Sequence, residues 1–439
     1  MSQPPPLSAR AALDLLAPGH VALPARESGG PPDGPLGWPG YDAGRERAAA
    51  RAGSSEAVRC AVGRVGETEA VLIAFEFAFL GGSIGWSAGE RIAGALRTAR
   101  DLALPVVSVL ASGGTRVQEG MHALTQLQGI AGGMVRLRGA GLPHLAVLAG
   151  PVTGGGWVTL GAGSDVRLAL PGTQVGFSGA RVRPPDADPA AYTAEAQLAA
   201  GHLDGIVERE ALPETVARWL RLLTRPARGP VEPPRAVRAA VPPATGWEAV
   251  RAARAADRPD AGAYLRAHFT RLAPLASVDP ALSVGFGERA GRSIGYVAQH
   301  GTPTTPAGFR AAVRLLRLAD GLGIPVLTLV DTPGAANDAD AERDGVGAAI
   351  AETFTAMAAS RLPVTTLLVG QGGSGGAAAL TAPARTWVTA ESYYSVLPPE
   401  SAAAVLKRDA AQVAEVAELL RLRPQDLVAH GLARGVVAP

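Results

Sequence analysis

Short apolar segments alternate along the chain with longer segments that carry apolar residues on one helical face. Residues 71–77 are apolar apart from Glu76 and are expected to form a strand, and residues 88–102 have helical spacing through Ile92, Leu96 and Ala99. The alternation continues with strands expected at 106–110 and 145–149 and a helix expected at 117–137. Short buried strands that alternate with amphipathic helices are typical of parallel β–α units. The sequence therefore predicts an α/β fold.

The second half of the chain repeats this pattern, without a gap, at an offset of 220 residues. Strands are expected there at 293–298, 326–331 and 364–369. Prolines that precede strands align between the halves: Pro105 with Pro325, and Pro143 with Pro363. The glycines of the connecting loops align as well. Two like domains with glycine-rich loops at matched places predict one active site built between two related halves.

Composition divides the chain further. The expected segments are an N-terminal extension at 1–60, a first domain at 61–225, a linker at 226–246 and a second domain at 247–439. The extension is rich in Pro, Gly and Ala, with helices expected near Leu7–Leu16 and Arg45–Arg51. Repeated prolines between the two domains are typical of a semi-rigid linker.

Length, charge and cysteine content exclude several classes of protein. The chain has 439 residues and 47% hydrophobic content, which is ample for two large cores. It has no apolar run of about 18 residues and no leader-like start, so a cytoplasmic protein is expected rather than a membrane protein. The net charge is +2 with scattered basic residues, which argues against nucleic-acid binding. The only cysteine is Cys60 and the seven histidines lack metal-ligand spacing, so no metal is expected.

Four glycine-containing loops follow predicted strands and lead into predicted helices. They lie at 112–116, 153–157, 332–336 and 371–377. Glycine lets the backbone approach a ligand closely, and the first N–H groups of a helix have no intrahelical acceptor. A pair of such N–H groups can stabilise an oxyanion, each by roughly 3–4 kcal/mol in the transition state. The alternative is that these loops are tight turns that only pack helix against sheet, but the matched positions favour chemistry.

The second of these loops in the second half also fits another motif. Gly372-Gly373-Ser374-Gly375-Gly376 contains G-x-S-x-G after a strand, which is the nucleophile elbow of α/β-hydrolases. His430 is the only histidine downstream, and the aligned position in the first half is Gly154 rather than a serine. A nucleophilic serine is therefore the weaker interpretation.

At these loops the sequence resembles the carboxyltransferase of acetyl-CoA and other acyl-CoA carboxylases. The first half resembles the β subunit in FEFAFLGGSIG, ASGGTRVQEGM and GPVTGGGWVTLGAGSDVRLALPGTQVGFSGARV. The second half resembles the α subunit in TPAGFRAAVRLLRLADGLGIPVLTLVDTPGA, LLVGQGGSGGAAAL and YYSVLPPESAAAVL. The likeness covers about 65–439, as if β and α were fused in one chain. The chain lacks the four-cysteine zinc ribbon usual in the β subunit, and Gln371 stands where the family usually has glutamate.

The resemblance implies a crotonase-like fold, with two tandem β-β-α superhelix domains and two oxyanion holes. One hole would stabilise the enolate of an acyl-CoA thioester, and the other the ureido oxygen of carboxybiotin. By resemblance, the first hole is formed by Gly113 and Gly114, with Gly154 and Gly155 beside it. The second hole is formed by Gly375 and Gly376, with Gly334 and Gln371 beside it. Biotin's own ureido nitrogen can take the α-proton, so no catalytic His or Glu is expected.

The implied function is the carboxyltransferase step of a biotin-dependent acyl-CoA carboxylase, with acetyl-CoA converted to malonyl-CoA. The implied partners are a biotin carboxyl carrier protein and a biotin carboxylase, with the fused chain forming a homodimer. Two alternatives stay open. One is a biotin-independent decarboxylase of malonyl thioesters that uses the same enolate hole; the other is a non-catalytic assembly subunit.

Recognition of CoA requires cations, and Lys407 is the only lysine, so arginine is the expected phosphate ligand. Arg116 follows the first glycine loop, and Arg181 and Arg183 follow the segment Gly176–Gly179. A planar guanidinium suits phosphate oxygens, and at least one of the three is expected to bind a CoA phosphate. The alternative is that they are surface or ion-pair arginines.

Overall fold

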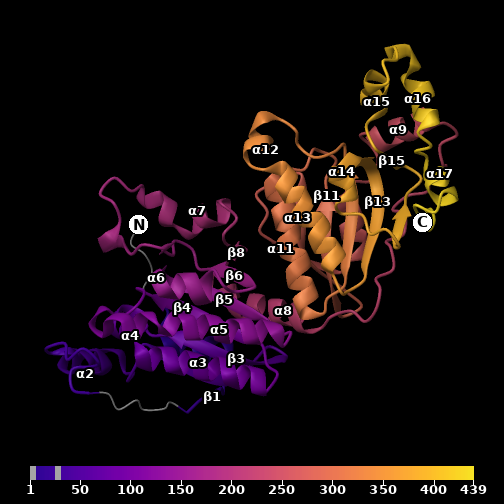
Figure 1. Cartoon of the computed structure of the whole chain (residues 1–439). Coiled ribbons are helices and arrows are strands. Elements are labelled where there is room, and N and C mark those ends of the chain that lie inside the picture. Colours follow the sequence, from indigo (N-terminus) through magenta and orange to yellow (C-terminus); the bar gives the residue numbers. More distant parts are fainter. Residues whose placement is uncertain (1–5, 25–30) are drawn as a thin grey trace. The chain divides into compact units, whose positions relative to one another are not determined.

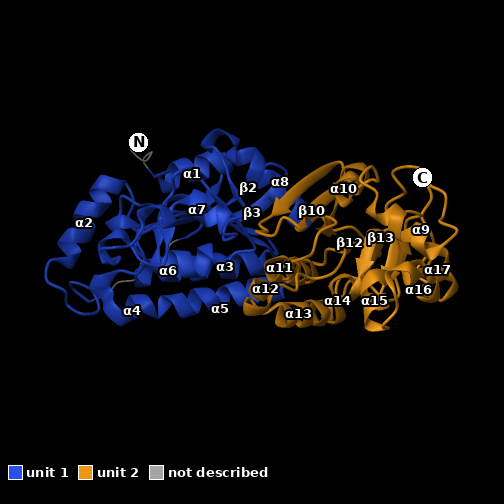
Figure 2. Ribbon diagram, turned by 90° about the horizontal axis from the view of Figure 1, so that it is seen from above, with its two compact units in different colours: residues 1–224 blue, residues 225–439 orange. Residues whose placement is uncertain are grey.

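A computed structural model describes residues 6–24 and 31–439 of the chain (Figure 1). The chain divides into two compact units, Met1–Thr224 and Arg225–Pro439, which are coloured separately in Figure 2. The domain boundaries inferred from composition stay predictions. Residues of the expected linker lie against the second sheet, because Ala227 N–H donates to the Ser293 carbonyl at 2.9 Å and Thr365 Oγ1 donates to the Val231 carbonyl at 2.7 Å.

The first unit is built on one mixed sheet with the strand order β1-β2-β3-β4-β5-β6-β8, and β7 pairs with the end of β5. The strands are β1 (Val21–Ala22), β2 (Val58–Val65), β3 (Thr68–Phe75), β4 (Val106–Ser112), β5 (His144–Thr153), β6 (Val166–Ala169), β7 (Val175–Gly176) and β8 (Gly205–Ile206). β1, β2 and β3 pair antiparallel, whereas β3 to β6 pair parallel. The parallel part carries the predicted β–α units, and the antiparallel strand β2 was not predicted.

Helices precede, connect and follow the parallel strands of this unit. They include α1 (Ala9–Leu16), α2 (Tyr41–Ala52), α3 (Trp86–Asp101), α4 (Gly120–Leu124), α5 (Gln126–Gly139), α6 (Gly154–Gly156), α7 (Ala194–Ala199) and α8 (Leu212–Thr224). α3 buries Ile92, Leu96 and Ala99, the residues whose spacing predicted it. The helix predicted at 117–137 is found in three pieces. Gly120, with φ +53°, separates a short 3-10 turn from α4, and Thr125 separates α4 from α5 although its own backbone angles are helical.

The second unit has a sheet with the order β14-β13-β12-β11-β10-β9, and β15 pairs with the end of β13. Its strands are β9 (Arg271–Leu275), β10 (Leu282–Arg289), β11 (Arg292–Gln299), β12 (Val326–Thr332), β13 (Val364–Gly373), β14 (Thr386–Val388) and β15 (Tyr393–Ser395). Its helices include α9 (Gly246–Arg254), α10 (Ala261–His268), α11 (Pro306–Leu322), α12 (Ala339–Arg343), α13 (Val346–Ala359), α14 (Ser374–Ala378), α15 (Pro399–Val405), α16 (Val413–Leu419) and α17 (Pro424–Ala429). β10, β11, β12 and β13 correspond in order and direction to β2, β3, β4 and β5.

The offset between the two units is not constant, which corrects the expectation of a gap-free repeat. β2 begins at Val58 and β10 at Leu282, 224 residues apart, whereas β4 begins at Val106 and β12 at Val326, 220 residues apart. The connection from β3 to α3 is four residues longer than that from β11 to α11. The glycine loops lie after this difference, which is why they align at 220.

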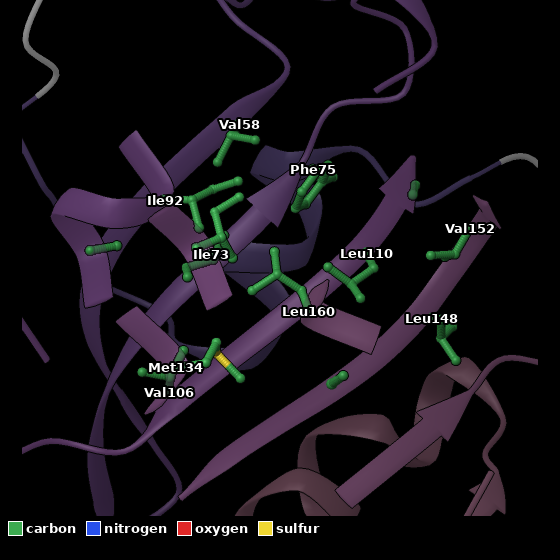
Figure 3. Close-up of a cluster of buried hydrophobic side chains, with 14 of the residues drawn as sticks. Val58, Ile73, Phe75, Ile92, Val106, Leu110, Met134, Leu148, Val152 and Leu160 are labelled. Atoms are coloured by element: carbon green, nitrogen blue, oxygen red, sulfur yellow. The ribbon is translucent and has the colours of Figure 1, made fainter. Parts of the chain in front are cut away.

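The core of the first unit fills the space between the parallel strands and the helices that cover them (Figure 3). Ile73 and Val106 from neighbouring strands and Ile92 from α3 are fully buried there. Leu148 on β5 and Leu160, just after α6, extend the cluster to the segment that carries the glycine loops. Packing of this density fixes the strand ends and therefore the loops that follow them.

One buried histidine makes stability depend on pH. His144 on β5 is 1% exposed, its Nε2 lies 2.7 Å from Ser108 Oγ, and burial lowers its pKa to about 3. A histidine whose pKa falls on folding stabilises the fold above its unfolded pKa, and this contribution is lost as the pH drops below that value. Lowering the pH from 7 to 5 should therefore cost about 2 kcal/mol through this residue. Urea unfolding at both pH values should show that His144→Gln loses less free energy of unfolding than the unsubstituted chain. An equal loss would contradict the claim that His144 causes this pH dependence.

Candidate active site: two glycine loops

The first glycine loop follows β4. Gly114 has φ +106°, and its N–H donates to Ser112 Oγ at 3.3 Å. Its carbonyl accepts from Ile84 N–H at 2.8 Å, which joins this loop to the segment before α3. The N–H of Gly113 donates to the Gly81 carbonyl at 2.8 Å. Gly113 therefore has no free N–H for a ligand, which corrects the expected role of this residue as a donor.

The second loop of the first unit leads from β5 directly into α6. Gly154 has φ +53°, and its N–H donates to the Phe177 carbonyl at 2.9 Å. Gly155 is the second residue of α6, so its N–H has no intrahelical acceptor. A Cβ built on Gly154 would lie 3.1 Å from the Gly114 Cα, so the two loops touch through their backbones. The structure thus brings Gly114, Gly154 and Gly155 together.

The second unit repeats this arrangement at the ends of β12 and β13. Gly334 has φ +149°, and its N–H donates to Thr332 Oγ1 at 3.2 Å, which matches the bond from Gly114 to Ser112. Its carbonyl accepts from Thr304 N–H at 3.2 Å, the counterpart of Ile84. A Cβ on Gly376 would lie 2.5 Å from the Ala335 nitrogen, so the loops of this unit also meet through their backbones.

Gly375 differs from its neighbours because the space in front of it is open. A Cβ built there would meet no heavy atom within 4 Å. As the second residue of α14, its N–H has no intrahelical acceptor, and the same holds for Gly376. Two N–H groups at a helix start, one of them beside open space, can bind a developing negative charge.

Ser374 begins α14 in a left-handed conformation, with φ +53°, the same φ as Gly154 in the first unit. This conformation belongs to the repeated loop and does not itself indicate a nucleophile. Within the described ranges, no histidine hydrogen-bonds to Ser374. The nucleophile-elbow interpretation therefore lacks the base that a serine nucleophile needs.

Gln371 lies on β13 at the start of the second loop of the second unit, and it makes three hydrogen bonds. Its N–H donates to Asp331 Oδ1 at 3.0 Å, and its Oε1 accepts from Arg254 Nε at 3.1 Å and from the Tyr393 hydroxyl at 3.3 Å. Burial raises the pKa of Asp331, against the opposing effect of Arg258. Sequence reasoning missed Asp331 as part of this site, because an aspartate at a strand end is ordinary in a sequence.

The three candidate phosphate ligands have different surroundings. The Arg116 side chain is 1% exposed and paired with Glu56 and Glu119, so it cannot reach a CoA phosphate, and that expectation is corrected. Arg183 lies over the Tyr192 ring, 3.6 Å from its centroid. Arg181 is exposed and, within the part of the chain that the structure describes, has no hydrogen-bond or ion-pair partner.

Two kinds of feature are absent from the described residues. No helix there has the length and apolar composition to cross a bilayer. Among the same residues, no three His, Cys, Asp or Glu side chains gather in a way that could hold a metal ion.

Comparison with solved structures gives the class of the fold. The chain superimposes on transcarboxylase 12S with methylmalonyl-coenzyme A and methylmalonic acid bound at a TM-score of 0.81 and 22% identity. The match covers 98% of this chain and 87% of that chain. The fold is crotonase-like, as the resemblance implied, with glycine loops at strand ends in both units.

Sequence comparison gives the family. Residues 41–211 match the family described as carboxyl transferase domain, and residues 236–439 match acetyl co-enzyme A carboxylase carboxyltransferase-like proteins. The chain is 37% identical over 411 residues to the acetyl-coenzyme A carboxylase carboxyl transferase subunits beta/alpha of Saccharopolyspora erythraea, covering 88% of this chain and 72% of that protein. It is 34% identical over 429 residues to the probable biotin-dependent acyl-coenzyme A carboxylase beta3 subunit of Mycobacterium tuberculosis, covering 92% and 84%. The chain belongs to the carboxyl transferase family of acyl-CoA carboxylases, in the fused β/α form.

Proposed function

We propose that the chain transfers a carboxyl group from carboxybiotin to the α-carbon of an acyl-CoA, with acetyl-CoA the first substrate to test. The single observation that carries this proposal is the duplicated pair of glycine loops, with matched hydrogen bonds at Gly114 and Gly334. One reaction with two oxyanions, an enolate and a ureido oxygen, needs two such sites. Family membership supplies the two substrates.

The first unit is proposed to bind the thioester. The N–H group of Gly155 would donate to the thioester oxygen and stabilise the negative charge that develops when the α-proton leaves. The N–H group of Gly114 would add a second donor by exchanging its long bond to Ser112 Oγ, at 3.3 Å, for the ligand. Gly113 is removed from this role because its N–H makes a short backbone bond to the Gly81 carbonyl, at 2.8 Å. The loops supply fixed dipoles and orientation, and no titratable side chain of this chain is required for the proton.

The second unit is proposed to bind biotin, which a separate carrier protein would present. When bound, carboxybiotin supplies the carboxyl group, and its ureido nitrogen is the base for the α-proton. The residues fit this ligand because the space before Gly375 is open and the N–H groups of Gly375 and Gly376 begin a helix. Gly334 would lie beside them, and the Gln371 amide would border the loop.

The partners proposed with this function are a biotin carboxyl carrier protein and a biotin carboxylase, in the cytoplasm. In a homodimer, the first unit of one chain would work with the second unit of its mate. No partner is described in the structure, and the proposal rests on the family.

The experiment combines the purified chain with a biotinylated carrier domain, biotin carboxylase, ATP, bicarbonate and acetyl-CoA. Malonyl-CoA that forms only with the carrier present would support the proposal. Decarboxylation of malonyl thioesters without biotin would support the decarboxylase alternative instead. No turnover in either assay, with both loops folded, would indicate an assembly subunit.

Arg181 is proposed as the CoA phosphate ligand because it is exposed and has no hydrogen-bond or ion-pair partner among the described residues, whereas Arg116 is buried. A charge-assisted contact of this kind contributes roughly 1.5–3 kcal/mol. Arg181→Gln should raise KM for acetyl-CoA about 10- to 150-fold and spare kcat, because the phosphate is bound equally in ground and transition states. The control is Arg100→Gln, an exposed arginine paired with Asp101. An unchanged KM in Arg181→Gln would place the phosphate elsewhere.

A further inference from the structure

Glycines have no side chains of their own, so other residues must hold the geometry of these loops. In each unit one arginine with little solvent exposure makes hydrogen bonds that can do so. We propose that Arg116 in the first unit and Arg258 in the second are positioning residues, each of which fixes one glycine loop for its own half of the reaction. This inference rests on the proposed function, since the two halves of the reaction are defined there.

Arg116 is the last residue of the first glycine loop and ties the loop to the neighbouring segment. Its backbone N–H donates to the Ile84 carbonyl at 2.9 Å, and its Nη2 donates to the Ser83 carbonyl at 2.9 Å. Its Nη1 donates to Glu56 and Glu119 at 3.2 and 3.1 Å. Arg116 thus joins the Gly114 loop to the segment that accepts its backbone bonds.

The carboxylates that hold Arg116 are themselves tied to the unit. Glu56 Oε1 accepts from Ala57 N–H at 2.7 Å, just before β2. Glu119 Oε2 accepts from Trp86 N–H at 2.5 Å, and the Tyr41 hydroxyl at the start of α2 donates to Glu119 Oε1. The segment expected from composition to be an N-terminal extension therefore takes part in holding the first loop.

Arg258 performs the corresponding task in the second unit by another route. Its Nη2 donates to Asp331 Oδ2 at 2.5 Å, at the end of β12. The other oxygen, Asp331 Oδ1, accepts from Gln371 N–H at 3.0 Å, just before the Gly375 loop. The Arg258 and Asp331 side chains are 10% and 1% exposed. Arg258 Nε also donates to the Ala253 carbonyl at 2.6 Å, which anchors the arginine at the end of α9.

The side chains that hold the loops, Arg116 in the first unit and the Arg258–Asp331 pair in the second, do not occupy equivalent positions in the repeat. At the offset of the glycine loops, Arg116 corresponds to Ala336, and Asp331 corresponds to Ala111. The loop geometry is repeated between the units, but the side chains that hold it are not. The same mechanical requirement is met twice with different residues, which indicates that the position of the loop matters in both.

The mechanism predicts separable effects. Misplacing a reacting group by about 1 Å can cost about 100-fold in rate. Arg116→Gln should lower deuterium exchange at the acetyl-CoA α-carbon, measured with imidazole as base, by about that factor. Arg258→Gln should leave this exchange unchanged and lower carboxyl transfer by about the same factor. KM for acetyl-CoA should change little in both variants.

The controls are Arg100→Gln and Arg317→Gln, whose arginines pair with carboxylates at the surface of the first and second unit. Arg116→Lys and Arg258→Lys keep the charge but lose the planar guanidinium with its several N–H donors. Each should therefore be faster than the corresponding Gln variant but slower than the unsubstituted chain. If Arg116→Gln does not fold, Tyr41→Phe takes its place in the exchange assay, because it removes only the hydroxyl that is hydrogen-bonded to Glu119 and Arg116.

Heat unfolding of every variant separates positioning from stability. The proposal would be overturned if folded Arg116→Gln kept full exchange, or if Tyr41→Phe did so where it replaces that variant. It would also be overturned if Arg258→Gln lost exchange and transfer equally, or if the variants lost stability while their rates stayed unchanged. If the unsubstituted chain shows exchange but no carboxyl transfer, the proposed function fails, and Arg116 is still judged by exchange alone.

Discussion

Gly114→Val is expected to lower both α-proton exchange in acetyl-CoA and carboxyl transfer by about 100- to 1,000-fold, the loss typical of removing an oxyanion donor. Gly114 has φ +106°, which a β-branched residue adopts only with strain. Its added Cβ would make only an ordinary contact with Gly154 Cα, at 3.5 Å, so the backbone strain rather than a Cβ clash is expected to displace the loop.

The control for Gly114→Val is Gly129→Ala on α5, where an added Cβ meets nothing within 4 Å. This control should keep both activities. Heat unfolding is measured first, because a strained loop also lowers stability. Folded Gly114→Val with unchanged exchange would remove the first loop from the chemistry.

Gly375→Val should lower carboxyl transfer to a similar extent, about 100- to 1,000-fold, and spare proton exchange. The isopropyl group would fill the open space in front of α14, where the ureido oxygen is proposed to bind. Gly375 is a sharper probe than Gly376, because a Cβ on Gly376 would lie 2.5 Å from the Ala335 nitrogen and would distort the loop itself.

Stability of Gly375→Val should match that of the unsubstituted chain. Gly347→Ala at the start of α13 is the matched control, since a Cβ there also meets nothing within 4 Å. Gly375→Val should lower transfer without altering the midpoint of heat unfolding, whereas Gly347→Ala should alter neither. Equal transfer in both variants would contradict a ligand site at the second loop.

Much of the fold could be predicted from sequence because parallel strands are buried on both faces and therefore read as apolar runs. β4 and β12 are buried throughout, and both were found by their sequence. β2 was missed because only three of its eight residues are buried, which leaves no continuous apolar run. The four-residue shift in the repeat was missed because it falls in a connection, where length is weakly constrained.

The glycine positions of the site could also be predicted, because positive φ and close approach restrict those positions to glycine. Gly114 and Gly334 are found where the repeat placed them. The hydrogen bond that occupies Gly113 could not be predicted, because its acceptor, Gly81, is distant in sequence. Nor could the burial of Arg116, since an arginine beside a glycine loop gives no local sign that two distant carboxylates will enclose it.

The most direct test of the central claim follows the labelled carboxyl carbon of [3-13C]malonyl-CoA when the chain is incubated with biotin. If the two loops bind thioester and biotin for one transfer, the label should appear on biotin, and the transfer should be lost in Gly375→Val. Release of the label as CO2 at the same rate with and without biotin would contradict carboxyl transfer and identify a decarboxylase.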